Sequence, residues 1–477
     1  MEAERTNWQS RLIETLGSEK VRLDDATRRV YKFDAYTVER FLPAAIVFPT
    51  STVEVAEVVR LCEEEGVPYT ARGAGTGLSG GAMPALGGVV VSTKRMSEVI
   101  EIDPVNRVAH VQCGVPNASV SVAAAGHGLM FAPDPSSQSV STIGGNIAEN
   151  SGGPHTLKYG VTAQHVLQVK AVVSGGDIVT FGSLVPGGAG SDMIALFVGS
   201  EGTLGIATEA WLRLVPVPAE VATALVSFRT VSDATSAVSE IVARGVVPAA
   251  LELMDHFVLE AVSKAFEVSL KPGTAAALLV ECEGEVGEAD RELGLVLDTC
   301  SEQGAFHHEV AQGEGDRARL WTARKKGIGA MGRLAPTIVT HDGVIPRSRL
   351  AEMLETVYRV AEEAGLGVAN IFHAGDGNLH PCFYFDEREP GSIERAVAAG
   401  ERILARCVEL GGSVTGEHGI GVEKLGPLKL MFNDADLRLQ TDVRAAFAPS
   451  ELCNPCKVIP DQKGCVEHRS RWRGAAT

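Results

Sequence analysis

The sequence predicts an α+β protein that contains at least two domains. A chain of 477 residues is long enough for two or three domains with substantial cores. Its content of 45% hydrophobic and 22% charged residues is ordinary for a globular protein. Beyond a proline-rich break at 216–218, strand and helix patterns alternate, which favours an antiparallel sheet covered on one side by helices.

The residues before this break predict short strands separated by long irregular segments. A polar, mostly helical lead-in, residues 1–38, precedes a helix that starts at a capping box formed by Ser51 and Glu54. Glycine is dense over 72–88 and 144–160, where we expect irregular backbone rather than regular elements. The strands expected in this part are 67–71, 89–91, 99–102, 108–112, 166–173, 178–180 and 211–215.

The residues after the break predict an alternating series of strands and helices. We expect strands at 223–228, 249–254 and 276–281, and helices near 232–243 and 256–266. The segment 449–460 is irregular, and the basic residues 469–477 are expected to be disordered.

The charge balance and two missing sequence features exclude several classes of function. Lys and Arg number 43 against 60 Asp and Glu, and the net charge of −17 argues against nucleic acid or an anionic membrane surface as the main ligand. No stretch approaches the roughly 18 apolar residues of a transmembrane helix, and the first residues lack the apolar core of a secretory signal. These features predict a cytoplasmic protein.

The nine cysteines predict reduced thiols, because they are odd in number and scattered in apolar surroundings. Cys453 and Cys456, with Cys465 and His468 beyond them, could also be read as a zinc or iron–sulfur site. Their spacing matches no standard pattern, so we expect free thiols there.

A predicted β-hairpin brings two histidines together and is the most specific feature of the sequence. Two strand-like segments, 368–372 and 379–385, flank Asp376-Gly377, a strong signal for a two-residue turn. Cross-strand partners would then have numbers that sum to 753, as those of His373 and His380 do, and their Cβ atoms would lie about 5 Å apart. A lone histidine is usually a satisfied core or surface residue, whereas two paired across a hairpin favour metal binding or catalysis.

Glu417 and His418 lie in a glycine-rich segment, 416–421, that could supply a third ligand. Alone, this segment would be read as an exposed turn. Combined with His373 and His380, Glu417 completes a two-histidine, one-carboxylate set, and His418 becomes a candidate general base. Such ligands accept zinc, manganese or iron, of which zinc is the commonest in proteins.

A second group of motifs indicates a phosphate-containing ligand. Residues 75–80 read G-x-G-x-x-G, but a dinucleotide-binding Rossmann unit needs a helix starting inside the motif, and 81–88 cannot form one. The tight turns instead predict a cradle of backbone N–H groups for phosphates. Two further segments, 133–146 and 199–206, offer hydroxyls and close backbone approach in the same way.

Together, the loop 72–81, the segment 133–160 and the turn 199–206 resemble the FAD-binding domain of the vanillyl-alcohol oxidase type. From about residue 30 to 460 the chain resembles the branch that holds the glycolate oxidase FAD subunit, D-lactate dehydrogenases and D-2-hydroxyglutarate dehydrogenase. The box from His373 to His380, the stretch 416–419 and the closing motif 454–458 match this branch.

The resemblance implies that FAD lies between two α+β subdomains, with its pyrophosphate on the loop 72–77 and its isoalloxazine near 133–137 and 144–146. It also implies an α+β cap domain with an antiparallel sheet. Because the first loop carries no histidine, FAD is expected to be noncovalent. The residues expected to bind FAD are Arg72, Gly73, Ala74, Gly75, Thr76, Gly77, Pro133, Asp134, Ser136, Ser137, Thr142, Gly144, Gly145, Asn146, Gly202, Thr203, Gly205 and Ile206.

This resemblance also implies a division of the chain. We expect an FAD-binding domain at 39–218 after the lead-in, a substrate- and metal-binding cap domain at 219–448, and a segment at 449–477 that returns to the FAD domain before its disordered tail.

The activity that the resemblance implies is oxidation of a small 2-hydroxy acid to the 2-oxo acid. A divalent metal would be held by His373, His380 and Glu417, with His418 as the base and Arg324 binding the substrate carboxylate. Two departures from the family pattern stand out: Cys456 replaces a usual glycine, and 340–342 lacks the lysine of hydroxyglutarate enzymes, which favours glycolate or D-lactate.

Three alternatives remain at this point: a D-2-hydroxyglutarate dehydrogenase, a noncatalytic flavin-binding subunit of an oxidase complex, and a metal-independent flavin transferase of the ether-lipid type. The last would share the FAD-binding domain but would not need His373. The sequence has no nicotinamide motif of its own, so electrons would leave to an acceptor protein, such as a quinone-linked iron–sulfur subunit. We therefore expect an oligomer or complex subunit, cytoplasmic or held at the membrane periphery by a partner.

Overall fold

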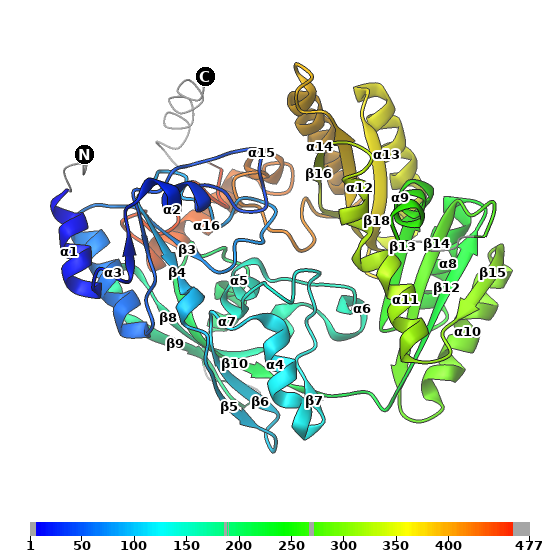
Figure 1. Ribbon diagram of the computed structural model, residues 1–477, viewed down its shortest axis with the longest axis horizontal. Coiled ribbons are helices and arrows are strands. Elements are labelled where there is room, and N and C mark those ends of the chain that lie inside the picture. The colour runs from blue at the N-terminus through cyan, green and yellow to red at the C-terminus, as the bar shows by residue number, and fades with distance from the viewer. Residues whose placement is uncertain (1–5, 186–187, 189, 267–270, 461–477) are drawn as a thin grey trace. The chain divides into compact units, whose positions relative to one another are not determined.

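The computed structural model describes residues 6–185, 188, 190–266 and 271–460, and Figure 1 labels their helices and strands. The chain divides into two compact units. The first unit contains residues up to 151, residues 161–217 and residues from 418 onward, and the second contains 152–160 and 218–417. The second unit therefore includes residues 152–160, which lie in the sequence between two segments of the first unit.

The first unit contains a small, mostly parallel sheet. Its four strands follow the order β1-β2-β4-β3, in which β4 is parallel to both β2 and β3. Ser51 caps the next helix, α3, by accepting a hydrogen bond from the Glu54 N–H (3.2 Å), while the Glu54 side chain accepts from the N–H of Thr50 instead of Ser51. The elements are α1 (Asn7–Leu16), β1 (Val21–Arg22), α2 (Asp25–Val30), β2 (Ala45–Val47), α3 (Thr52–Glu64), β3 (Tyr69–Arg72) and β4 (Val89–Ser92).

A second sheet of the first unit is antiparallel and has five strands in the order β5-β6-β10-β8-β9. The strands β7 and β11 form a separate pair. The strands are β5 (Val99–Asp103), β6 (Val108–Gln112), β7 (Leu129–Met130), β8 (Val166–Val172), β9 (Ile178–Gly182), β10 (Ile206–Arg213) and β11 (Val215–Pro216). The helices are α4 (Asn117–Ala124), α5 (Ile143–Glu149), α7 (Met193–Phe197), α15 (Leu425–Leu428) and α16 (Asp434–Phe447).

Helix α5 corrects the expectation of irregular backbone over 144–160. The Thr142 hydroxyl accepts a hydrogen bond from the N–H of Gly145 and so caps the helix start. Ile143 and Ile147 are buried on one side, four residues apart. Capping and burial therefore outweigh the low helix propensity of the two glycines. A second short helix, α6 (Thr156–Tyr159), follows in the same stretch.

The second unit is built on a nine-stranded antiparallel sheet. Its main path is β15-β12-β14-β13-β18-β19-β17, with β20 pairing β18 and β16 pairing β20. The strands are β12 (Glu220–Phe228), β13 (Ala250–Asp255), β14 (Ala276–Gly284), β15 (Ala305–Val310), β16 (Thr337–Thr340), β17 (Gly343–Val344), β18 (Gly367–His373), β19 (Asn378–Leu379) and β20 (Pro381–Phe385). The helices are α8 (Val231–Ala243), α9 (His256–Phe266), α10 (Glu288–Glu302), α11 (Glu314–Lys325), α12 (Gly327–Met331), α13 (Leu350–Ala364) and α14 (Ser392–Glu409).

Helices cover both faces of this sheet, which corrects the expectation of one covered face (Figure 1). Helices α8, α10, α13 and α14 pack on one face, where Leu251 and Leu253 belong to the core. Helices α9, α11 and α12 pack on the other, with Ala250 and Met254. All residues of β13 are buried, because a strand covered on both sides has no solvent-facing positions.

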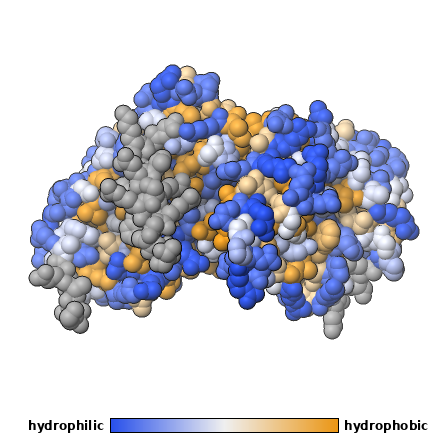
Figure 2. All heavy atoms as spheres, turned by 90° about the horizontal axis from the view of Figure 1, so that it is seen from above, coloured by the Kyte–Doolittle hydropathy of each residue, from blue (hydrophilic) through white to orange (hydrophobic). Residues whose placement is uncertain are grey.

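Most apolar side chains lie in these cores, and Figure 2 shows many hydrophilic residues on the visible face, with hydrophobic residues between them. Nowhere in the described chain does a helix combine the length and hydrophobicity needed to cross a bilayer. Seven described cysteines are free thiols, Cys453 among them, whereas Cys456 is disulfide-bonded, which corrects the expectation of a free thiol at that position. Cys465 and His468 lie outside the described residues.

Candidate functional site

The hairpin that carries His373 and His380 exists, but its register differs from the expected one. His373 pairs with Asn378, and a four-residue turn, 374–377, joins the strands. Of Asp376 and Gly377, only Gly377 has a positive φ (80°), whereas a two-residue turn of the expected type needs positive φ at both positions. The register prediction is therefore wrong by two residues.

A shift of two residues leaves a side chain on the same face of a sheet, because side chains alternate with a period of two. His373 and His380 consequently still meet, as diagonal rather than direct neighbours. Their ring centroids lie 5.1 Å apart, with the rings nearly perpendicular. Both side chains are buried.

Glu417 joins the two histidines. Its Oε1 atom lies 3.2 Å from Nε2 of His373 and 3.2 Å from Nε2 of His380. Burial by itself would raise the pKa of the Glu417 carboxyl, but the two imidazoles outweigh it and hold that pKa well below its usual range. Two imidazole nitrogens and a carboxylate oxygen, within 4.8 Å of one another, form a donor set that fits a divalent cation such as zinc, manganese or iron.

Asp342 fixes the turn that presents Glu417, a role that the sequence did not reveal. One of its carboxylate oxygens accepts hydrogen bonds from the Thr415 hydroxyl (2.6 Å) and the Gly416 N–H (2.9 Å), and the other accepts from the Glu417 N–H (3.3 Å). A Cβ at Gly416 would lie 2.3 Å from Oδ1 of Asn378, so a larger residue in this turn would displace the Asn378 side chain of β19.

Glu252 on β13 is the second residue that sequence reasoning missed. It is fully buried, and its Oε1 atom lies 2.7 Å from Nδ1 of His373, its cross-strand partner. Its other oxygen accepts a hydrogen bond from Nε of Arg324. The signal was an acid in the middle of the otherwise apolar stretch 249–254, since a buried charge needs partners.

The structure brings Arg324 into this cluster, and His418 is the residue that follows Glu417 in the chain. Arg324 is buried on α11, with its Nη2 atom 3.5 Å from Nδ1 of His373. His418 follows Glu417 directly and begins the C-terminal segment of the first unit. Its side chain is half-buried, and its backbone carbonyl accepts a hydrogen bond from the Ser79 hydroxyl (2.7 Å).

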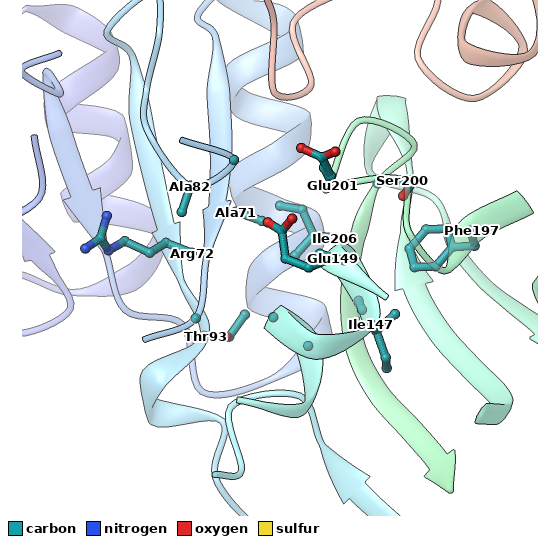
Figure 3. A pocket seen from close by; sticks show the side chains of 18 residues that line it. Ala71, Arg72, Ala82, Thr93, Ile147, Glu149, Phe197, Ser200, Glu201 and Ile206 are labelled. Carbon is teal, nitrogen blue, oxygen red and sulfur yellow. The ribbon is translucent and has the colours of Figure 1, made fainter. Parts of the chain in front are cut away.

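A cavity in the first unit contains part of the expected cofactor residues (Figure 3). Its walls are mainly glycine and apolar side chains, which suit the close approach of a planar aromatic ligand. The expected residues that line it are Arg72, Gly73, Gly144, Gly145, Gly202, Gly205 and Ile206. The remaining lining residues, not foreseen from the sequence, are Ala71, Gly81, Ala82, Thr93, Ile147, Ala148, Glu149, Phe197, Ser200, Glu201 and Ala207.

The other expected cofactor residues do not line this cavity, and some of them have structural contacts instead. Asn146 donates to the side chain of Asn117 (2.8 Å), which in turn donates to the carbonyl of Pro133 (2.8 Å). The residues outside the lining are Ala74, Gly75, Thr76, Gly77, Pro133, Asp134, Ser136, Ser137, Thr142, Asn146 and Thr203.

The guanidinium of Arg72 points away from Glu149 and Glu201 in Figure 3. It donates a hydrogen bond to the Phe33 carbonyl (2.9 Å) and lies over the ring of Tyr31.

Two acidic residues, Glu149 and Glu201, line the cavity. Glu201 accepts hydrogen bonds from the N–H groups of Ile420 and Gly421, each at 2.6 Å. Oε2 of Glu149 is a buried atom that has no hydrogen-bond partner among the described residues. An unpaired carboxyl oxygen in a cavity of this kind fits a ligand with a polar group nearby, as FAD has.

Replacing Glu149 with glutamine should reduce the loss of stability on raising the pH. Burial raises the pKa of Glu149 well above its usual range; the charges of Glu201 and Asp34 raise it further, and Lys424 and Lys457 oppose them. The folded state therefore favours the protonated carboxyl. The stability that this preference contributes is complete below the ordinary pKa of 4.5 and is lost as the pH rises above it.

Glutamine stays neutral, so we expect Glu149→Gln to be more stable than the wild type by about 1–3 kcal/mol at pH 8, with a smaller difference at pH 5. Urea unfolding at both pH values measures this, and Glu101→Gln, at an exposed glutamate of β5, is the control. Parallel pH dependences in the wild type and Glu149→Gln would contradict the expectation.

Both the N-terminal and the C-terminal part of the chain match known protein families. Residues 43–182 match a family described as an FAD binding domain, and 217–458 match the C-terminal domain of FAD linked oxidases. The chain is 42% identical to the glycolate oxidase subunit GlcD of Escherichia coli (strain K12), over 92% of this chain and 88% of that one. It is 35% identical to a D-lactate dehydrogenase of Archaeoglobus fulgidus, over 87% and 91% of the two chains.

A solved structure of p-cresol methylhydroxylase with substrate bound has the same fold, with a TM-score of 0.79 at 18% identity, over 94% of this chain and 96% of that one. The predicted fold class is thereby confirmed: an FAD-binding domain of the vanillyl-alcohol oxidase type with an α+β cap that contains an antiparallel sheet. From the two matching families and the extent of these similarities, the chain belongs to the FAD-linked oxidases.

Proposed function

We propose that this chain is an FAD-dependent dehydrogenase that oxidises a small 2-hydroxy acid, glycolate or D-lactate, to the 2-oxo acid with the help of a divalent metal. The observation that carries the proposal is the meeting of His373, His380 and Glu417 around one point. A noncatalytic flavin-binding subunit would not need two buried histidines and a half-buried glutamate at such distances, which argues against that alternative.

The names of the relatives support the substrate class. One is called a glycolate oxidase subunit and another a D-lactate dehydrogenase, and both are similar to this chain along most of its length. Glycolate and D-lactate share a hydroxyl on the carbon next to a carboxylate. That pair of oxygens can chelate a cation held by two imidazoles and one carboxylate, which leave coordination positions open.

The residues of the chain would divide the work as follows. His373, His380 and Glu417 hold the cation, and the terminal nitrogens of Arg324 bind the substrate carboxylate, for which a planar guanidinium is suited. His418 accepts the proton of the substrate hydroxyl. When bound, the cation would supply a Lewis acid that lowers the pKa of that hydroxyl, and FAD would supply the two-electron acceptor for the oxidation at C2.

The electrons would leave the protein to an acceptor other than NAD, because the chain lacks a nicotinamide-binding motif of its own. We propose that a protein partner or a quinone-linked subunit accepts these electrons. The chain would then function as part of an oligomer or a complex. A small monocarboxylate is favoured because 340–342 reads Thr-His-Asp, with no lysine to bind a second carboxylate. D-2-Hydroxyglutarate is the second candidate substrate.

An anaerobic substrate screen tests the proposal. The FAD-loaded protein is mixed with glycolate, D-lactate, L-lactate or D-2-hydroxyglutarate, and reduction is followed as loss of flavin absorbance. We expect rapid bleaching with glycolate or D-lactate, slow bleaching with hydroxyglutarate, and loss of all bleaching after treatment with a strong chelator. Bleaching that survives complete metal removal would overturn the role of the metal, and no bleaching with any of these acids would overturn the substrate class.

A further inference from the structure

Glu252 is a buried acid that lies between the guanidinium of Arg324 and the imidazole of His373, a candidate metal ligand. Its side chain is fully buried on β13, and its register partner on β18 is His373. Both residues lie on the sheet face that α11 covers, the helix that carries Arg324. A carboxylate in such a place is tolerated only when both of its oxygens have strong partners, and here His373 and Arg324 are those partners.

The contact with Glu252 determines which nitrogen of His373 carries a proton. A carboxylate oxygen only accepts hydrogen bonds, so at 2.7 Å from Glu252 Oε1 the Nδ1 atom of His373 must be the protonated one. In the neutral ring, Nε2 then has the free lone pair. Nε2 is also the atom that lies 3.2 Å from Glu417, where a cation would be bound.

The second oxygen of Glu252 ties Arg324 to the same point. Nε of Arg324 donates a hydrogen bond to this oxygen. The same carboxylate therefore orients both the guanidinium of Arg324 and the imidazole of His373. Arg324 in return compensates the negative charge, which keeps Glu252 available as an acceptor for His373.

We propose that Glu252 is the positioning residue of the metal centre: it fixes the Nδ1–H form and the ring orientation of His373, and it anchors Arg324 to the same carboxylate. This inference rests on the proposed function, in that it requires a metal at His373, His380 and Glu417. Hydrogen bonds of this kind to a metal-bound histidine typically change metal affinity by about 10- to 100-fold.

The test measures metal affinity in the FAD-loaded protein. Binding of Zn²⁺ to the wild type and to Glu252→Gln is measured by competition with a chromophoric chelator. We expect Glu252→Gln to bind Zn²⁺ about 10- to 100-fold more weakly. The d–d absorption bands of bound Co²⁺, which report the ligand field at the metal, should also shift in this variant.

Glu281→Gln is the matched control. Glu281 is another fully buried glutamate, on the neighbouring strand β14, and it also pairs with an arginine, Arg317, but it has no contact with His373 among the interactions of the described residues. We expect this variant to keep the wild-type affinity and Co²⁺ spectrum. Equal weakening in both variants would mean general destabilisation and would overturn the inference.

The outcomes separate the inference from the function on which it rests. A wild type that binds neither Zn²⁺ nor Co²⁺ would overturn the proposed function. A wild type that binds metal, together with Glu252→Gln of unchanged affinity and spectrum, would overturn only the role of Glu252. Should Glu252→Gln not fold, Glu252→Asp keeps the charge with a shorter reach, and we expect its affinity to lie below that of the wild type; an unchanged value would again overturn the role.

Discussion

Replacing His380 with alanine is expected to slow substrate reduction of the flavin by about 1,000-fold. A bound cation that polarises the substrate contributes several kcal/mol to the transition state, and each 1.4 kcal/mol is a factor of ten in rate. His380 supplies one of only three ligands, so its loss should release the metal. The rate of anaerobic flavin bleaching and the metal content of the purified protein measure the two effects together.

The FAD content of this variant should stay at the wild-type level, because the cavity for the cofactor lies in the first unit and His380 in the second. His256→Ala is the control: His256 belongs to the second unit as well, but its side chain is 58% exposed, and it should keep both metal and activity. Full activity of a metal-free His380→Ala protein would remove the metal from the mechanism. Normal metal content with lost activity would show that His380 acts in another way than as a ligand.

The hairpin shows which parts of the site a sequence can determine. Whether two side chains lie on the same face depends only on whether the register changes by an even or an odd number of residues. The register itself depends on the turn, in which Gly377 packs against a distant part of the chain. A Cβ at this position would lie 2.1 Å from the carbonyl oxygen of Ile345, more than thirty residues away. Such a contact has no local signature, so the meeting of His373 and His380 was predictable and their pairing was not.

The same distinction explains the residues that were missed. His373 and His380 lie close together in the sequence, so a local pattern can indicate that they meet. Glu252 is more than a hundred positions from His373 and contacts it only because β13 and β18 are neighbouring strands. Strand order in a sheet with long connections is not encoded in local patterns. The second helical layer was missed for a related reason, since it is the face where Glu252 and Arg324 interrupt the apolar pattern.

In the first unit, the segments expected to bind the cofactor line the cavity mainly with their glycines and less with their polar side chains. Glycines at 73, 144 and 202 line the cavity, as expected from the need for close backbone approach. Hydroxyl and amide side chains in the same segments, such as Thr142 and Asn146, are used instead to cap α5 and to connect it to neighbouring loops. A polar side chain in a loop can serve the ligand or the fold, and only the surrounding structure decides between them.

Replacing His418 with alanine should lower the rate of flavin reduction by about 10²- to 10⁴-fold, the usual contribution of a general base. Unlike the His380 variant, this one should keep both metal and FAD, since His418 is not one of the three proposed ligands, His373, His380 and Glu417. A histidine must be neutral to accept a proton, so the wild-type rate should fall on the acid side of the pH profile. The variant should lack that dependence.

Single-turnover bleaching between pH 5 and 9 provides this profile, and metal and flavin analysis of the same samples provides the comparison with His380→Ala. His127→Ala, at an exposed histidine of the first unit, should behave as the wild type at every pH. If His418→Ala keeps the acid limb at a uniformly reduced rate, the proton is taken by another group, and His418 affects the reaction through the position of Glu417, its neighbour in the chain. If it also loses the metal, the turn itself has collapsed; its glycines and the bonds of Asp342 then matter more than the imidazole.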